Sequence, residues 1–140
     1  MPDIQYTSMT IQEYDQVVEL WQNSPGIALS AVDSREHIAE FLQRNPGLAF
    51  VARVDGQLAG AVMAGNDGRR GYLYHLAVAK EYQRLGIGQA LARRVLDALK
   101  AAGIQKCHIF VVADNQAGLR FWQSTGWKKR DDIFVMSYDL

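Results

Sequence analysis

The sequence has almost no cysteine and no surplus of charge of either sign. Cys107 is the single cysteine among 140 residues, so an intramolecular disulfide and a cysteine-built metal site are excluded. Lysine plus arginine and aspartate plus glutamate each total 15. A neutral chain lacks the basic surplus with which proteins bind nucleic acid. We therefore expect no nucleic-acid partner and no metal, and we expect any anion site to be local.

A long hydrophobic run is also missing. No apolar segment approaches the roughly 18 residues that a membrane-spanning helix needs. The opening residues, Met1 to Gln5, are largely polar and do not resemble a secretory signal. Together with the lone cysteine, these features favour a cytoplasmic protein with no membrane partner. The composition, 49% hydrophobic and 21% charged, suits one globular domain over residues 1–140.

Strand and helix patterns alternate along the chain. Helices are expected after Thr10, after Asp33, over residues 88–102 and from Asn115 to Ser124. Strands are expected over residues 4–9, 48–54, 57–64, 72–78 and 106–112, with Trp127 and residues 133–138 completing the sheet as a hairpin bent through Asp131-Asp132.

Local sequence signals predict where two helices begin and where a hairpin turn lies. Thr10 with Glu13 forms a capping box, and Asp33 with Glu36 repeats the signal, so Asp33 is expected to begin the second helix. Asp55-Gly56 is typical of a hairpin turn. The element order predicts an α/β (α+β) fold with a mixed, mostly antiparallel sheet and helices on both faces. Parallel neighbours are expected only where the third helix crosses between strands.

The segment from Gln83 to Gly88 has the features of an anion site. Gly86 and Gly88 lack Cβ atoms, so a ligand can approach the backbone closely. The amides here can converge as a nest, and the helix that follows adds unpaired N–H groups and its dipole. Arg84 adds a charge and Gln83 a side-chain donor. The alternative is a plain strand-to-helix turn. A Walker-type nucleotide loop is excluded because Gly-Lys-Ser and Gly-Lys-Thr are absent.

Three motifs resemble those of the GNAT superfamily of N-acetyltransferases. Residues 83–88 resemble its Q/R-x-x-G-x-G/A signature, and residues 76–78 resemble the end of its fourth strand. Residues 115–127 resemble its late N-x-x-A-x-x-x-Y-x-x-x-G-F motif. The resemblance covers essentially the whole chain. It implies the GNAT fold, with six or seven strands, about four helices, and fourth and fifth strands that splay apart.

The resemblance also implies acetyl-CoA as cosubstrate. Its pantetheine arm would pair with the fourth strand, its pyrophosphate would bind the loop amides, and the Val78 amide would stabilise the oxyanion. Asn115 would hydrogen-bond the arm, and two aromatic side chains would line it. The implied cofactor-binding residues are Leu76, Ala77, Val78, Gln83, Arg84, Leu85, Gly86, Ile87, Gly88, Asn115, Phe121 and Trp122.

The implied reaction is direct attack of a primary amine on the acetyl thioester, which a general base would assist. The candidates are Tyr74, where many relatives carry a glutamate, His75 and His108. Regular alternation points His75 to the face opposite Tyr74, but a bulge, common in this strand of the family, would rotate it inward. The family's usual acid is a tyrosine, and Trp122 stands in its place. An indole cannot supply that proton at neutral pH.

The acceptor pocket of this family is built by the first two helices and their connection, here the small, apolar and hydroxyl-bearing segment 24–32. It suits a modest amine or a peptide N-terminus and does not distinguish them. Asp67 is a further candidate for contacting a cationic acceptor. A covalent route through Cys107 is disfavoured, because strand neighbours such as His108 point apart.

Trp122 and the missing strand glutamate keep a second interpretation open, namely a non-catalytic acyl-CoA-binding module with a sensing or regulatory role. Homodimers are common in the family. The C-terminal strand would then be a contact between two copies.

Overall fold

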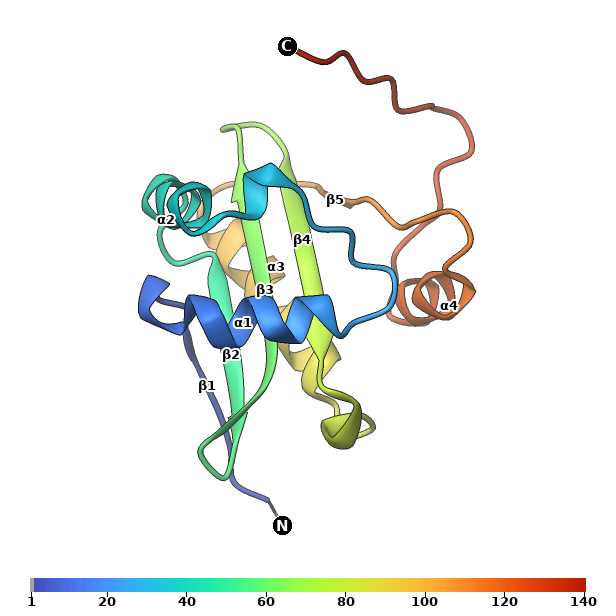
Figure 1. The fold of residues 1–140 in the computed structure, drawn as a ribbon. Coiled ribbons are helices and arrows are strands. Elements are labelled where there is room, and N and C mark those ends of the chain that lie inside the picture. Colours follow the sequence, from blue (N-terminus) through green and yellow to red (C-terminus); the bar gives the residue numbers. More distant parts are fainter. Residues whose placement is uncertain (1) are drawn as a thin grey trace.

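The computed structural model describes residues 2–140 and shows an open five-stranded sheet with helices on both faces (Figure 1). The strands are β1 (Ile4–Ser8), β2 (Ala49–Val54), β3 (Gln57–Asn66), β4 (Gly71–Val78) and β5 (Cys107–Ile109). The helices are α1 (Tyr14–Gln22), α2 (Arg35–Arg44), α3 (Ile87–Ala101) and α4 (Gln116–Ser124), with 3-10 turns η1 (Ile11–Glu13), η2 (Ala31–Asp33) and η3 (Lys80–Tyr82).

The sheet order is β1-β2-β3-β4-β5, antiparallel throughout except for the parallel pair β4–β5. The parallel pair is the one that α3 connects, as the crossover rule predicts. In Figure 1, α1 and α2 lie in front of the sheet, α3 lies behind it, and α4 lies beyond β5. No helix formed by residues 2–140 is long and apolar enough to cross a membrane.

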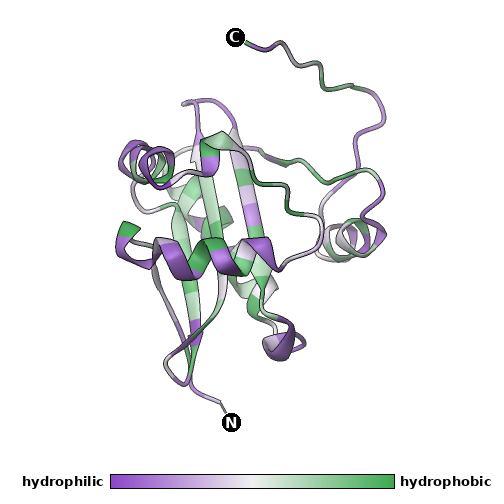
Figure 2. Ribbon diagram, viewed as in Figure 1, coloured by the Kyte–Doolittle hydropathy of each residue, from purple (hydrophilic) through white to green (hydrophobic). Residues whose placement is uncertain are grey.

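β3 is buried on both faces and so divides the core in two. Val62 and Ala64 pack with the apolar stripe of α3. Ala61 and Met63 pack on the other side, with the helices α1 and α2. In Figure 2 the strands are mostly hydrophobic, whereas the helices carry hydrophilic bands. β4 is thereby held between two helical layers.

Most of the expected local signals are confirmed. The Thr10 N–H donates to Glu13 Oε1 at 2.9 Å, which completes the first capping box. Asp55 and Gly56 turn β2 into β3 with φ of 49° and 85°. Such positive φ values at both central residues are those of the hairpin turn that this dipeptide favours.

The second capping signal is wrong in its details. Ser34, not Asp33, precedes α2 and accepts a hydrogen bond from the backbone N–H of His37. Asp33 ends η2 instead, where its carboxylate accepts the Ser30 N–H at 3.0 Å. Ser30 and Asp33 have the spacing of a capping box themselves, so Asp33 completes the earlier turn and cannot also cap the later helix.

β4 carries the bulge that the resemblance implies. Met63 faces Tyr74 and Ala61 faces Ala77, so the single residue Val62 is opposed by two residues of β4. One of the two, His75, has a left-handed backbone with φ of 55°. The bulge breaks the alternation of side chains, and His75 is no longer required to face away from Tyr74.

The fold class is as expected, but the sheet has five strands rather than six or seven. Residues 128–140 form no strand, and Phe134 and Met136 are 92% and 93% exposed. Trp127 packs against the ring of Trp122 and joins no sheet. β-propensity reflects packing on a pleated, half-buried surface. These apolar residues have no such surface beside them, so their alternating pattern alone does not make a hairpin.

Candidate active site

β4 and β5 separate halfway along the sheet. β5 pairs with β4 only through Gly71, Tyr72 and Leu73, so it is shorter than the expected strand 106–112. Beyond Leu73 the two segments of the chain diverge, as the resemblance implies for the fourth and fifth strands. A cavity of about 870 Å³ opens in this gap, between β4, the loop before α3, residues 109–112 and α4.

The exposed edge of β4 offers backbone groups to this cavity. Ala79 donates its N–H to the Ala59 carbonyl at 2.7 Å. Antiparallel ladders alternate between bonded and non-bonded pairs, so the adjacent pair of Val78 with Gly60 is non-bonded. The N–H and C=O of Val78 therefore point away from β3, toward the gap. The carbonyl accepts the Gln83 side-chain amide at 3.2 Å.

The loop before α3 forms the mouth of the gap. Arg84 and Gly86 have left-handed backbones, with φ of 69° and 79°. The first helical bond runs from the Ala90 N–H to the Gly86 carbonyl, so the amides of the helix's first turn, Ile87 and Gly88 included, have no helical partner. A Cβ built on Gly86 would meet nothing within 4 Å. The space beside Gly86 is therefore open, and free amides next to such a space suit a diphosphate.

The cavity gathers most of the residues expected to bind the cofactor. Those that line it are Leu76, Val78, Gln83, Arg84, Gly86, Ile87, Gly88, Asn115, Phe121 and Trp122. Ala77 and Leu85 do not line it. Ala77 is buried beneath α1 and α2, whereas Leu85 is 43% exposed.

Asn115 and Trp122 form the wall opposite β4. Asn115 Oδ1 accepts the Gly118 N–H at 3.0 Å and so caps α4, as expected. A Cβ on Gly26 would lie 2.5 Å from Asn115 Nδ2, so the α1–α2 connection passes directly over this cap. Trp122 is 8% exposed and packs edge-on against the rings of Phe121 and Trp127. Its side chain supports the wall by packing.

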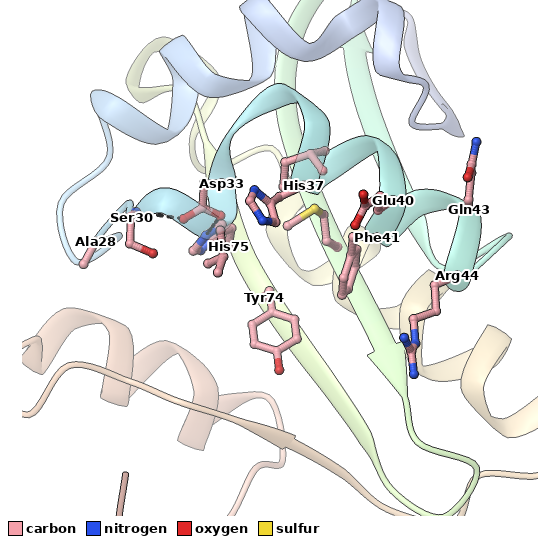
Figure 3. A pocket seen from close by; sticks show the side chains of 13 residues that line it. Ala28, Ser30, Asp33, His37, Glu40, Phe41, Gln43, Arg44, Tyr74 and His75 are labelled. Carbon is pink, nitrogen blue, oxygen red and sulfur yellow. Dashed lines mark hydrogen bonds and ion pairs between the residues drawn. The ribbon is translucent and has the colours of Figure 1, made fainter. Parts of the chain in front are cut away.

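A second cavity, of about 830 Å³, lies between η2, α2 and β4 (Figure 3). Its walls are apolar at Ile38, Phe41 and Met63 and carry charge at Glu40 and Arg44. Three residues, Ala28, Tyr74 and His75, line both cavities, and the last two belong to β4. The two spaces therefore meet at the β4 bulge.

His75 is held from two sides at this junction. Its Nε2 lies 2.9 Å from Asp33 Oδ1, and the two side chains are 18% and 8% exposed. Its carbonyl accepts the Trp21 Nε1–H at 3.0 Å, and the two rings meet edge-on at 4.9 Å. Asp33 was not among the expected catalytic residues. Only its spacing from Ser30 in the sequence could have indicated that it belongs to η2 rather than to α2.

The comparisons with known proteins agree with this geometry. The family model described as the acetyltransferase (GNAT) family matches residues 14–127. The chain belongs to the GNAT acetyltransferase family. An acetyltransferase of Sodalis glossinidius is 30% identical over 91% of this chain and 89% of its own, and one of Yersinia pestis is 32% identical over 88% and 86%.

Among solved structures, the PaiA N-acetyltransferase of Thermoplasma acidophilum, in complex with coenzyme A, has a TM-score of 0.80. The match covers 92% of each chain at 22% identity, so it establishes the fold.

Tyr74, one of the sequence candidates for the base, is partly buried and lines both cavities. Burial raises the pKa of its phenol, and Tyr72 and Cys107 add to the effect. The phenol therefore stays protonated at neutral pH. Its ring meets Phe41 edge-on at 5.9 Å, and its hydroxyl points away from Asp33 and His75 (Figure 3).

The structure places two other sequence candidates away from the cavities. His108 lies opposite Tyr72 in the β4–β5 pair, with the ring centroids 5.8 Å apart, and lines neither cavity. Asp67 accepts the backbone N–H groups of Arg69 and Arg70 in the β3–β4 turn, which lowers its carboxyl pKa. The Asp67 carboxylate therefore stabilises the turn.

Cys107 is expected to be dispensable. Burial raises the pKa of its thiol to about 11, so only about one molecule in 10⁴ carries the nucleophilic thiolate at pH 7. We expect Cys107→Ala to retain acetyl transfer within about twofold, and alkylation of the wild-type thiol to accelerate up to about pH 11. A loss of more than tenfold in turnover, with the fold intact, would mean that the thiol takes part.

Proposed function

We propose that this GNAT protein, acting as one domain over residues 1–140, transfers the acetyl group of acetyl-CoA to a primary amine of a small molecule or peptide by direct attack. The proposal is carried by one observation: the β4–β5 gap, with its anion cradle at one end, meets the second cavity at His75. A donor and an acceptor entering from opposite sides would meet at the bulge.

The residues around the gap fit the parts of acetyl-CoA. The loop amides and the Arg84 guanidinium would hold the diphosphate, and the edge of β4 would pair with the pantetheine amides. Asn115 lines the same cavity, and its side-chain N–H groups would donate to the arm. Bound there, acetyl-CoA supplies an activated acetyl thioester. The Val78 N–H would donate to its carbonyl oxygen.

The acceptor must lose a proton before it attacks, because an alkyl ammonium titrates near pH 10. His75 is the candidate that the geometry favours, since it lines both cavities and histidine is the side chain that most often acts as a general base. The nitrogen–carbon bond forms, the carbon–sulfur bond breaks, and the thiolate takes up a proton. The sum is amide, free CoA thiol and one released proton.

The test is acetyl transfer itself. The protein would be incubated with acetyl-CoA and, separately, an alkylamine, spermidine, an aminoglycoside and a peptide with a free N-terminus. Thiol release would be followed together with the mass of the amine. We expect at least one amine to gain one acetyl group for each thiol released. Binding of acetyl-CoA without transfer to any amine would favour the acyl-CoA-binding module instead.

We further propose a homodimer in which the C-terminal segment, residues 133–138, is the contact. The segment exposes Phe134, Met136 and Tyr138 almost completely, and exposed apolar groups of this size mark association surfaces. Sedimentation of the wild type is expected to give a dimer, and a Phe134→Asp, Met136→Asp double variant a monomer. A monomeric wild type would refute this contact.

A further inference from the structure

We infer that Asp33 is a positioning residue, which fixes His75 in the tautomer whose Nδ1 accepts the proton of the acceptor amine. The inference rests on the proposed acetyl transfer and adds to it a residue from outside the expected site. Its elements are η2, which carries Asp33, and the β4 bulge, which carries His75 (Figure 3).

Asp33 is itself rigidly held. Its Oδ2 accepts the Ser30 N–H at 3.0 Å, and its backbone carbonyl accepts the Tyr14 hydroxyl at 2.6 Å. With the side chain only 8% exposed, a carboxylate here needs its remaining oxygen satisfied as well. The His75 ring provides that partner, at 2.9 Å.

The pairing determines where the ring proton lies. An ionised carboxylate only accepts hydrogen bonds, so the nitrogen that faces it, Nε2, must carry hydrogen. In the neutral ring, Nδ1 then holds the lone pair. The Asp33 carboxylate would also stabilise the imidazolium formed when Nδ1 accepts a proton, because the opposite charge is in direct contact.

The free nitrogen is also accessible. Nδ1 of His75 makes no hydrogen bond within residues 2–140, and no buried side-chain nitrogen or oxygen among those residues lacks a partner. Nδ1 is therefore not enclosed, and the cavities are the open space that His75 lines. The left-handed backbone at His75, φ 55°, is a strain that the Trp21 hydrogen bond to its carbonyl helps to hold.

Other ionisable groups share these walls and contribute to the field at His75. On η2 and α2 they are Asp33, His37, Glu40 and Arg44, on β4 Tyr74, and on the loop before α3 Tyr82 and Arg84. Only Asp33 is in contact with the ring nitrogen. A pH profile must therefore be read against a variant that removes a nearby charge without touching the ring.

The first experiment is NMR of the uniformly ¹⁵N-labelled protein without substrate. Long-range ¹H–¹⁵N correlations distinguish the two neutral tautomers of His75. We expect the Nε2–H form. The Nδ1–H form in the wild type would overturn the inference, whatever the activity.

The second experiment compares variants by pH profiles of kcat/KM and by acetyl-CoA affinity. In Asp33→Asn one amide cannot accept from both Ser30 and His75, so the tautomer becomes mixed and kcat/KM falls about 10- to 100-fold. In His75→Gln the side chain can still donate a hydrogen bond to Asp33, but the acidic limb of the pH profile of kcat/KM is expected to be lost. Acetyl-CoA affinity is expected to stay within twofold in both. Glu36→Gln, an exposed charge change on the neighbouring helix α2, is the control and should keep the wild-type profile.

The outcomes separate the two proposals. If Asp33→Asn and His75→Gln both keep the wild-type pH profile of kcat/KM, the inferred roles of Asp33 and His75 are overturned, but acetyl transfer still stands. An inactive wild type refutes acetyl transfer. Should Asp33→Asn fail to fold, the wild-type tautomer and the His75→Gln profile still decide the question.

Discussion

Replacing Gly86 with leucine is expected to weaken acetyl-CoA binding at least about 100-fold. The new side chain would occupy the open space beside the loop amides, where nothing now lies within 4 Å of a Cβ. Each lost hydrogen bond to a charged oxygen is worth about 1.5–3 kcal/mol, so two of them account for that factor. Titration calorimetry with acetyl-CoA measures the change.

The same helix supplies a matched control. Gly103 follows α3 at its other end, with φ of 87° and no atom within 4 Å of a Cβ. Gly103→Leu therefore imposes about the same left-handed strain, about 1–2 kcal/mol, far from the cradle. Both variants should lose similar stability, and only Gly86→Leu should lose affinity. Equal affinity in the two variants would show that the loop is only a turn.

Trp21→Ala is expected to destabilise the fold by about 3–5 kcal/mol, the usual range for truncating a fully buried tryptophan. Trp21 is 0% exposed and lies between α1 and the β4 bulge. The loss combines the apolar contacts of the ring with the hydrogen bond to the His75 carbonyl. Urea unfolding followed by circular dichroism measures it.

Trp21→Phe separates these two contributions. Phenylalanine keeps much of the buried ring but leaves the His75 carbonyl without its donor, for which we expect about 1–3 kcal/mol. Because that bond holds the bulge, Trp21→Phe should also lower kcat more than it raises the KM for acetyl-CoA. A variant with unchanged kcat would mean that the bulge keeps its shape without Trp21.

The sequence predicts the cofactor side of the site better than the proton-transfer side. The loop from Gln83 to Gly88 is a local feature, and its glycines, the helix after it and the strand before it are all visible in one short segment. The structure brings this loop and Asn115 to the same cavity. Short-range signals of this kind predict the local backbone conformation, because turn and cap residues act on the backbone beside them.

The Asp33–His75 contact depends on two features that the pattern did not resolve. Asp33 could complete the turn from Ser30 or cap the helix through Glu36, and only the structure shows the first. The bulge at His75 arises from the register of β4 on β3, a contact between strands. The two residues then meet across 42 positions of the chain, a distance that no local pattern spans.

At the C-terminal residues the sequence predicts a strand that the structure does not form. Ile133 to Tyr138 have strand composition, yet β4 and β5 pair over three residues only and no neighbour receives the segment. Arg130 and Asp132 form a local ion pair, with Nη2 and Oδ2 2.8 Å apart, just before it. A period-2 pattern states which face a strand would bury, but not whether a partner strand is available.

The most direct test of the account is a crystal structure of the protein with coenzyme A. The account predicts the diphosphate at the amides of residues 84–88, the pantetheine arm along Leu76 and Val78, and the sulfur close to the Val78 N–H, on the side of His75. Coenzyme A bound with its diphosphate away from this loop, or with its arm outside the β4–β5 gap, would contradict it.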